Sequence, residues 1–180
     1  MVVPIILYGS PVLRKPSIEI TVEDNILGIT EMLFDTLKNA EGIGLAGPQI
    51  NFLKRAFVID TSPLAEGDKT IEKYERAFIN PMILDRSNED VIFKEGCLSI
   101  PGIYEEVKRA TKIRVRYNDP SFNIIEEELN GIIARIFQHE YDHLEKILFI
   151  DKINTIRRKI LSSKLSKIRK LSRNSIDYYG

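Results

Sequence analysis

The chain has 180 residues, of which 43% are hydrophobic and 29% are charged, as in an ordinary soluble domain with one buried core. Lysine plus arginine and aspartate plus glutamate number 26 each, so the net charge gives no general attraction to DNA or to membranes. A single cysteine excludes an internal disulfide, and no apolar run approaches the ~20 residues that cross a bilayer. The first residues also lack a signal-peptide pattern, so we expect a cytoplasmic protein.

The first half of the chain predicts one helix followed by short strands. Thr21-Val22-Glu23-Asp24 has the form of a capping box, and apolar residues follow it at helical spacing (Ile26, Ile29, Leu33 and Leu37). Gly42 offers a stop for this helix. Strand-like segments then cover residues 56–60, 77–84, 113–117 and 122–128, with Asp119-Pro120-Ser121 as the turn between the last two.

Two further helices are predicted in the last third of the chain. Asn130-Gly131 introduces a helix over 132–147, whose apolar stripe also carries both histidines of the chain. A basic amphipathic helix follows over 152–171, with its apolar stripe formed by Ile153, Ile156, Ile160, Leu165 and Ile168. Strands interrupted by helices without regular alternation indicate the α+β class. We therefore expect one domain over 1–151 and a basic helix with a tail over 152–180.

The segment His139-Glu140-Tyr141-Asp142-His143 contains the only two histidines. On a helix, residues four apart project from one face, so both imidazoles can bind one metal ion. Glu140 then lies beside the ion, where it can handle the protons of a bound water. This is the H-E-x-x-H pattern of zinc-type hydrolases. The alternative is a pair of surface or core histidines with no metal.

A catalytic metal of this kind needs three protein ligands and an open position, and no third histidine exists. No glutamate follows Glu145, so the site with a downstream glutamate ligand is excluded. Asp151 or an upstream residue must serve. Cys97 is the attractive upstream residue, because a thiolate suits a borderline metal. A lone cysteine is also often just a small buried apolar residue, and that alternative stays open at this point.

Three segments, in this order, resemble the signature motifs of the peptide deformylase family: residues 42–49 (GIGLAGPQ), 95–99 (EGCLS) and 139–143 (HEYDH). The similarity extends over about residues 4–151 and includes PVLR at 11–14 and FINP at 78–81. It implies the α+β fold of that family, in which antiparallel strands pack around a central helix that carries HExxH. A C-terminal helix would follow this domain.

The resemblance also implies roles for individual residues. Cys97, His139 and His143 would hold the metal, and Glu140 would move protons. The side chain of Gln49 and the backbone N–H of Leu98 would stabilise the oxygen on which negative charge develops. The slot for a methionine side chain would be bordered by Ile43, Gly44, Leu98 and His139, with Ile136 and Phe93 as further candidates. The family's matching glutamate pairs with an arginine, which here implies a pair between Glu95 and Arg109.

The implied reaction removes the N-formyl group from the initiating methionine of new polypeptides and releases formate. The implied cofactor is one divalent ion, with Fe²⁺ favoured, although the ligands are equally compatible with Zn²⁺, Ni²⁺ or Co²⁺. The basic C-terminal helix resembles a ribosome anchor found in some bacterial deformylases. The equally weighted alternative is a helix packed on the domain with its cationic face in water.

Two other functions stay open on the sequence. The chain could be a different metallohydrolase, such as a peptidase or an amidase acting on other acyl groups. It could also be a non-enzymatic ribosome- or RNA-binding protein, although an intact Glu140 and a complete ligand set argue against that. Two residues depart from the family pattern: Gly47 replaces alanine, which would loosen its loop, and Lys146 replaces a glycine after the metal helix, which would alter the next turn.

Overall fold

The structure is a computed structural model that describes residues 1–176, so residues 177–180 of the predicted tail lie outside the described part. Its helices are α1 (Ile26–Asn39), α2 (Ser62–Gly67), α3 (Gly131–Leu144), α4 (Thr155–Ile160) and α5 (Ser162–Ile176). Short 3-10 turns are η1 (Pro11–Arg14), η2 (Gly47–Ile50) and η3 (Phe149–Asp151). The strands are β1 (Gly44–Ala46), β2 (Ala56–Asp60), β3 (Glu75–Arg86), β4 (Asp90–Cys97), β5 (Ile100–Ala110), β6 (Lys112–Asn118) and β7 (Ile124–Asn130).

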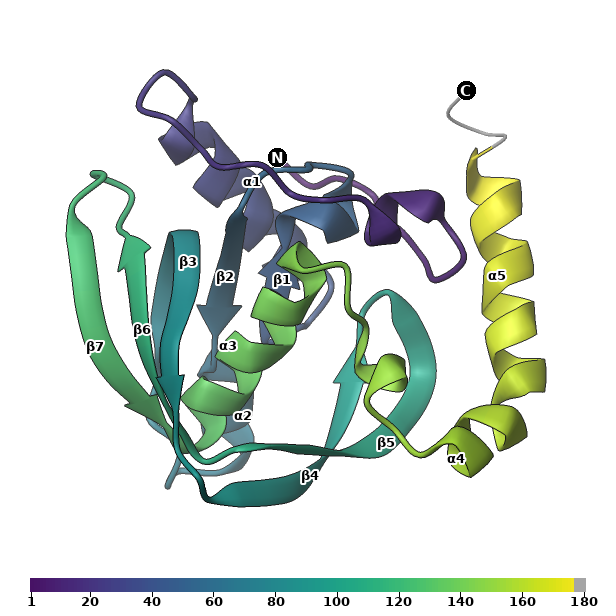
Figure 1. The fold of residues 1–180 in the computed structure, drawn as a ribbon. Coiled ribbons are helices and arrows are strands. Elements are labelled where there is room, and N and C mark those ends of the chain that lie inside the picture. Colours follow the sequence, from purple (N-terminus) through teal and green to yellow (C-terminus); the bar gives the residue numbers. More distant parts are fainter. Residues whose placement is uncertain (177–180) are drawn as a thin grey trace.

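Helix α3 lies between two antiparallel sheets (Figure 1). The larger sheet has the strand order β1-β2-β3-β6-β7, and the smaller one is the β4–β5 hairpin. The expected α+β class, with antiparallel strands around a central helix and a helix at the C-terminal end, is confirmed. No helix in the part of the chain that the structure describes has the length and apolar character to span a bilayer.

Side chains alternate between the two faces of a sheet, and β2 with the adjoining part of β3 is buried on both faces, whereas every second residue of β6 and β7 is exposed. On one face, Phe57 and Phe78 pack edge-on against Phe137 of α3, with ring centroids 4.9 and 5.0 Å away. On the other face, Val58 of β2 packs with Leu33 of α1 in a separate apolar cluster. The sheet therefore holds α3 rigidly from one side, and this helix carries the histidine pair.

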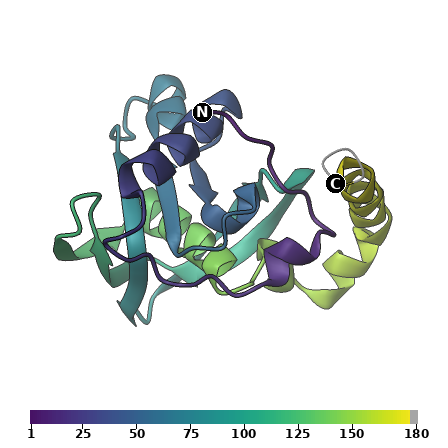
Figure 2. The same cartoon turned by 90° about the horizontal axis from the view of Figure 1, so that it is seen from above.

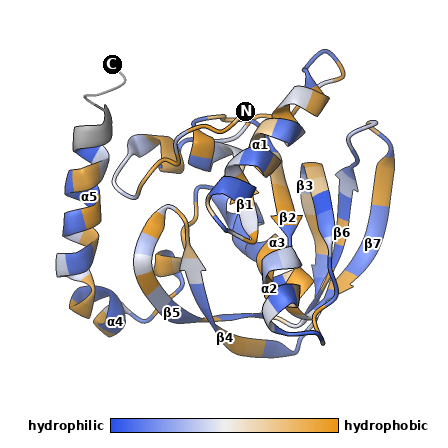
Figure 3. Ribbon diagram, turned by 180° about the vertical axis from the view of Figure 1, so that it is seen from behind, coloured by the Kyte–Doolittle hydropathy of each residue, from blue (hydrophilic) through white to orange (hydrophobic). Residues whose placement is uncertain are grey.

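The C-terminal helices pack on the far side of the hairpin from the larger sheet, beside the N-terminal segment (Figures 1 and 2). Leu161, Leu165 and Ile168 are buried against residues of β5, η1 and η3. Figure 3 shows hydrophobic and hydrophilic residues alternating along α5, whose polar side faces away from this contact. The Arg157 guanidinium also pairs with Glu105 of β5 at 2.6 Å. The basic helix is thus an integral part of the packed structure.

The single helix predicted over 152–171 is wrong in its extent and continuity. The chain forms two helices that meet at Leu161, and the second extends to Ile176. Ile153, unlike Ile156 and Ile160, is buried; the latter two are 67% and 63% exposed. The change of direction at Leu161 removes those two isoleucines from the stripe that faces the domain.

Most other boundaries differ by a few residues, and β2 has the predicted bounds. Helix α1 begins after the predicted capping box, because Asn25 caps it by accepting the Gly28 N–H at 3.1 Å. The Asp24 carboxylate instead accepts the N–H of Thr21 and closes the preceding turn. Helix α3 ends at Leu144 rather than 147, and β7 begins two residues later than expected. The β4–β5 hairpin was not predicted.

The structure shows the surroundings of the two residues that depart from the family pattern, Gly47 and Lys146. A Cβ at Gly47 would lie only 2.6 Å from the Phe52 carbonyl oxygen, so the glycine sits in a closely packed loop. Lys146 has φ 63°, the left-handed conformation that glycine favours after a helix. The amide of Ile147 then bonds to the Asp142 carbonyl at 2.8 Å, and the turn keeps the form expected with glycine.

Candidate metal centre

Three soft or borderline donors meet where α3 passes the end of β4. One ligand atom each from Cys97, His139 and His143 lies within 4.8 Å of the others. The Cys97 Sγ and the His143 Nε2 are 3.3 Å apart. The helix brings the two histidines to one face, and the end of β4 carries the cysteine to them. A thiolate and two imidazoles with this spacing fit a four-coordinate divalent metal that keeps one open position.

A buried carboxylate fixes the orientation of the first histidine. The Oε2 of Glu95 contacts the His139 Nδ1 at 2.9 Å, which leaves the Nε2 of that ring for a metal. Arg109 holds the same carboxylate through two hydrogen bonds of 2.6 and 2.9 Å, as the resemblance implied. Burial acts to raise the pKa of Glu95, but bonds from Arg109 and His139 outweigh it and hold this pKa well below its usual range. Glu95 is therefore ionised.

The two histidines differ in their electrostatics. Burial lowers the pKa of both rings. For His139, hydrogen bonds with Cys97 and Glu95 more than reverse this effect and carry the pKa well above its usual value. For His143, the positive charges of His139 and Arg109 add to burial, and its pKa lies well below its usual value. A proton thus competes with a metal for the donors of this cluster.

Glu140 is buried beside the donors without joining them. Its Oε2 has no hydrogen-bond partner among the described residues. Burial is the main cause that raises the pKa of Glu140 to about 7. A carboxyl group with this pKa can both accept and donate a proton near neutral pH.

The amide nitrogen of Gln49 also lies beside the metal-ligand cluster. Its Oε1 accepts the Ala46 N–H at 2.8 Å, and its Nε2 donates to Ser99 Oγ at 3.2 Å. The same nitrogen is 3.5 Å from Cys97 Sγ. Because both ends of the amide are committed, its N–H groups are held toward the metal-ligand cluster.

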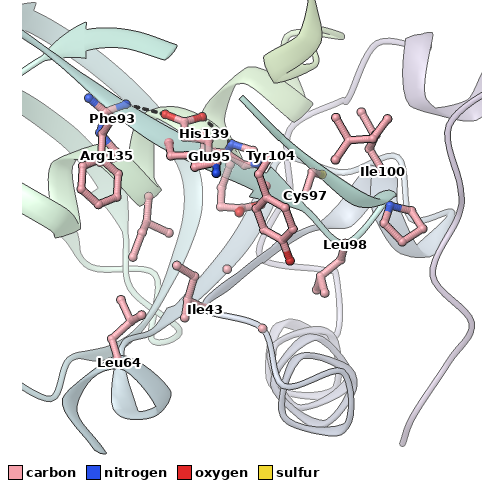
Figure 4. A pocket seen from close by; sticks show the side chains of 18 of the residues that line it. Ile43, Leu64, Phe93, Glu95, Cys97, Leu98, Ile100, Tyr104, Arg135 and His139 are labelled. Atoms are coloured by element: carbon pink, nitrogen blue, oxygen red, sulfur yellow. Dashed lines mark hydrogen bonds and ion pairs between the residues drawn. The ribbon is translucent and has the colours of Figure 1, made fainter. Parts of the chain in front are cut away.

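These groups open onto a cavity of about 520 Å³ (Figure 4). The sequence-predicted residues Ile43, Gly44, Gln49, Cys97, Leu98, His139 and Glu140 all line it, as do Ile136 and Phe93. His143 lies behind the wall and reaches the cluster from one helical turn further on. The structure therefore brings together every site residue expected from the sequence.

The structure adds residues in and behind the cavity wall that the sequence did not predict. Tyr104 of β5 covers Gly96 so closely that a Cβ there would lie 2.5 Å from the ring. Arg135 of α3 binds Glu95, and Asp142 accepts a bond from Arg109 at 2.7 Å. For Arg135, the available signal was its position four residues before His139, on the side of the helix that the isoleucine stripe predicted to be buried.

Comparison with known proteins agrees with this chemistry. The family described as polypeptide deformylase matches residues 2–159. The peptide deformylase of Cytophaga hutchinsonii is 42% identical over 173 residues, covering 94% of this chain and 92% of that protein. The one from Thermotoga neapolitana is 40% identical over 168 residues, covering 93% and 96%.

Solved structures show the same similarity. The peptide deformylase of Plasmodium falciparum superimposes with a TM-score of 0.85 at 36% identity, covering 94% of this chain and 97% of that one. The Thermotoga maritima enzyme gives 0.76 at 37% identity, covering 86% and 99%. Fold, ligand set and relatives thus lead to one conclusion: the chain belongs to the polypeptide deformylase family, whose reaction removes the N-formyl group from nascent peptides.

Proposed function

We propose that this deformylase binds its metal through Cys97, His139 and His143 and acts on the formyl group of N-formylmethionyl peptides. The convergence of the three donors within 4.8 Å supports the ligand assignment most strongly. A divalent ion in such a site lowers the pKa of a bound water and polarises a carbonyl group. The surrounding side chains then have three tasks: moving protons, stabilising charge and orienting the peptide.

Glu140 is the proposed proton carrier. It accepts the proton of the attacking water and later delivers it to the amine that leaves as the formyl C–N bond breaks. Burial raises the pKa of Glu140 to about 7, so near neutral pH this group can both accept a proton and donate one.

Gln49 and the backbone N–H of Leu98 are the proposed donors to the formyl oxygen. As water attacks the formyl carbon, negative charge grows on that oxygen, and prearranged donors stabilise it. The Gln49 amide is held in place by Ala46 and Ser99, so it needs no reorganisation during the reaction.

The methionine side chain is proposed to enter the apolar part of the cavity bordered by Ile43, Gly44, Leu98 and His139. Ile136 and Phe93 extend this wall. Turnover of a formyl-Met peptide compared with an acetyl-Met peptide tests the specificity. We expect formate release at a rate far above that of acetate release, and equal rates would indicate a general amidase.

Ferrous iron is the proposed native metal. The mixed thiolate and imidazole ligands accept Fe²⁺ but equally permit Zn²⁺, Ni²⁺ or Co²⁺. Metal analysis of protein purified without oxygen, paired with formate release from the same sample, distinguishes these ions. Iron content that tracks activity supports the proposal, and activity that tracks zinc contradicts it.

The segment from residue 152 onward is proposed to form a ribosome-binding unit that packs on a catalytic domain over 1–151, within a cytoplasmic enzyme. The exposed side of α5 carries Lys164, Lys167 and Lys170, which suit ribosomal RNA. Because α5 also covers apolar core, charge reversal at these lysines is a cleaner test than deletion. Cosedimentation with ribosomes should weaken in the triple Lys→Glu variant, and unchanged binding would contradict the proposal.

A further inference from the structure

The proposed metal ligands come from two separate elements. His139 and His143 belong to α3, whereas Cys97 ends β4 of the hairpin. The hairpin forms its own sheet, so the hydrogen-bond ladder of the larger sheet does not hold it. Metal–ligand distances tolerate only a few tenths of an ångström. Whatever fixes the hairpin against α3 therefore also fixes the metal site.

Arg135 crosses this boundary one helical turn before His139. Its Nη1 donates to Glu95 Oε1 at 2.6 Å and to the Val107 carbonyl at 3.0 Å. Its Nη2 donates to the Val91 carbonyl at 2.7 Å. Val91 belongs to β4 and Val107 to β5, so one guanidinium from the helix binds both strands of the hairpin.

The environment of this side chain makes the contact a rigid one. The Arg135 side chain is only 7% exposed, and its charge is matched by the Glu95 carboxylate, which is 6% exposed. The Phe93 ring lies 5.7 Å from the guanidinium, on the cavity side (Figure 4). A buried guanidinium stripped of these acceptors would be unfavourable, so the hairpin cannot move away from α3 without a large loss.

A second arginine makes the reciprocal connection. Arg109 lies on β5 and donates from its Nη1 to Asp142 of α3 at 2.7 Å. Two residues of α3 therefore anchor the hairpin: Arg135, one helical turn before His139, and Asp142, directly before His143. Arg109 alone already holds Glu95 with two hydrogen bonds. The distinct contribution of Arg135 is therefore its hydrogen bonds to the carbonyl oxygens of Val91 and Val107.

We propose that Arg135 is a positioning residue that fixes the β4–β5 hairpin against α3 and thereby sets the position of Cys97 relative to the two histidines. This inference rests on the proposed ligands. Without Arg135 the fold and Glu95 persist, but the cysteine sulfur is held less firmly. The metal then dissociates faster, and turnover falls in proportion to the metal that is lost.

The test uses Co²⁺-loaded full-length protein, because a thiolate bonded to Co²⁺ gives a charge-transfer absorption band. Arg135→Met should weaken this band and release Co²⁺ to a chelator about 10- to 100-fold faster than wild type. Arg135→Lys should release Co²⁺ at a rate between those of wild type and Arg135→Met, since an ammonium keeps the charge but lacks the planar fork that reaches both strands. Arg76→Met is the matched control, because Arg76 binds Tyr117 and Glu127 within the larger sheet, away from the ligands.

The control should lose thermal stability yet release Co²⁺ at the wild-type rate. A wild-type release rate and band in Arg135→Met would overturn the inference, as would equally fast release from the Arg76 variant. If Arg135→Met fails to fold, a wild-type release rate in Arg135→Lys overturns it instead. Failure of the ligand assignment is distinguishable, because the wild-type protein itself would then lack the thiolate band.

Discussion

Gly44→Ala tests the placement of the proposed proton carrier with a single added methyl group. A Cβ at Gly44 would lie 2.5 Å from Glu140 Oε1 and 2.9 Å from both Glu140 Cδ and Ile136 Cγ2. Gly44 is not among the residues with positive φ, so its backbone accepts alanine. The strand itself cannot retreat, because Gly44 is paired with Ile59 of β2 in the buried part of the sheet. The Glu140 carboxylate must therefore move.

The size of that movement sets the expected loss. Real Cβ atoms essentially never have contacts below 3.0 Å, whereas the added Cβ would lie 2.5 Å from the Glu140 oxygen. That oxygen must therefore shift by at least about 0.5 Å. A displacement of up to about 1 Å at a reacting group can cost ~10²-fold in rate, or about 2.7 kcal/mol of transition-state stabilisation. We expect kcat/KM for formate release to fall by about this factor while metal content stays unchanged.

Gly67→Ala is the matched control, because a Cβ there meets no atom within 4 Å. It should retain wild-type activity. A Gly44→Ala enzyme with kcat/KM within about threefold of wild type would contradict the proposed placement of Glu140, since the loss expected from the displacement is far larger. Either Glu140 would not be held where the structure places it, or it would not carry the proton.

Three further outcomes are expected. Glu140→Gln should keep its metal and lose about 10²- to 10⁴-fold in kcat, whereas Glu145→Gln, at the C-cap of the same helix, should not. Near-normal turnover in the first variant would remove Glu140 from the mechanism. Lys146→Gly should raise the unfolding free energy by about 1 kcal/mol, because glycine accepts the left-handed φ of 63° without strain; an unchanged or lower melting temperature would contradict this. The Glu95 pKa is depressed in the folded state, so its stabilisation is present above the unfolded carboxyl pKa and is lost as pH falls below about 5. Melting temperatures of metal-free protein across that range should fall more steeply for wild type than for Glu95→Gln, and parallel curves would show that Glu95 does not contribute.

Short apolar runs between polar residues predicted part of the fold. Strand β2 was predicted with its observed bounds, because Ala56–Asp60 is a short apolar run between polar residues. Strand β4 was not predicted, because its first five residues are all exposed and do not alternate between buried and exposed positions. The break between α4 and α5 carries no glycine or proline, and it arises from packing of α5 against residues far away in the chain.

The site shows the same division between local and long-range information. The ligand-bearing motifs are short and local, so the cluster of Cys97, His139 and His143 could be named from the sequence. Arg135 and Asp142 could not, because their roles depend on partners 28 to 44 residues away on the hairpin. Their charges would otherwise indicate an exposed helix face.

The most direct test of the account measures metal content and formate release on the same oxygen-free, reduced samples of wild type and Cys97→Ala. We expect one metal ion per wild-type chain, formate release proportional to metal content, and loss of both in the variant. A Cys97→Ala protein that keeps full metal occupancy and releases formate at the wild-type rate would contradict it.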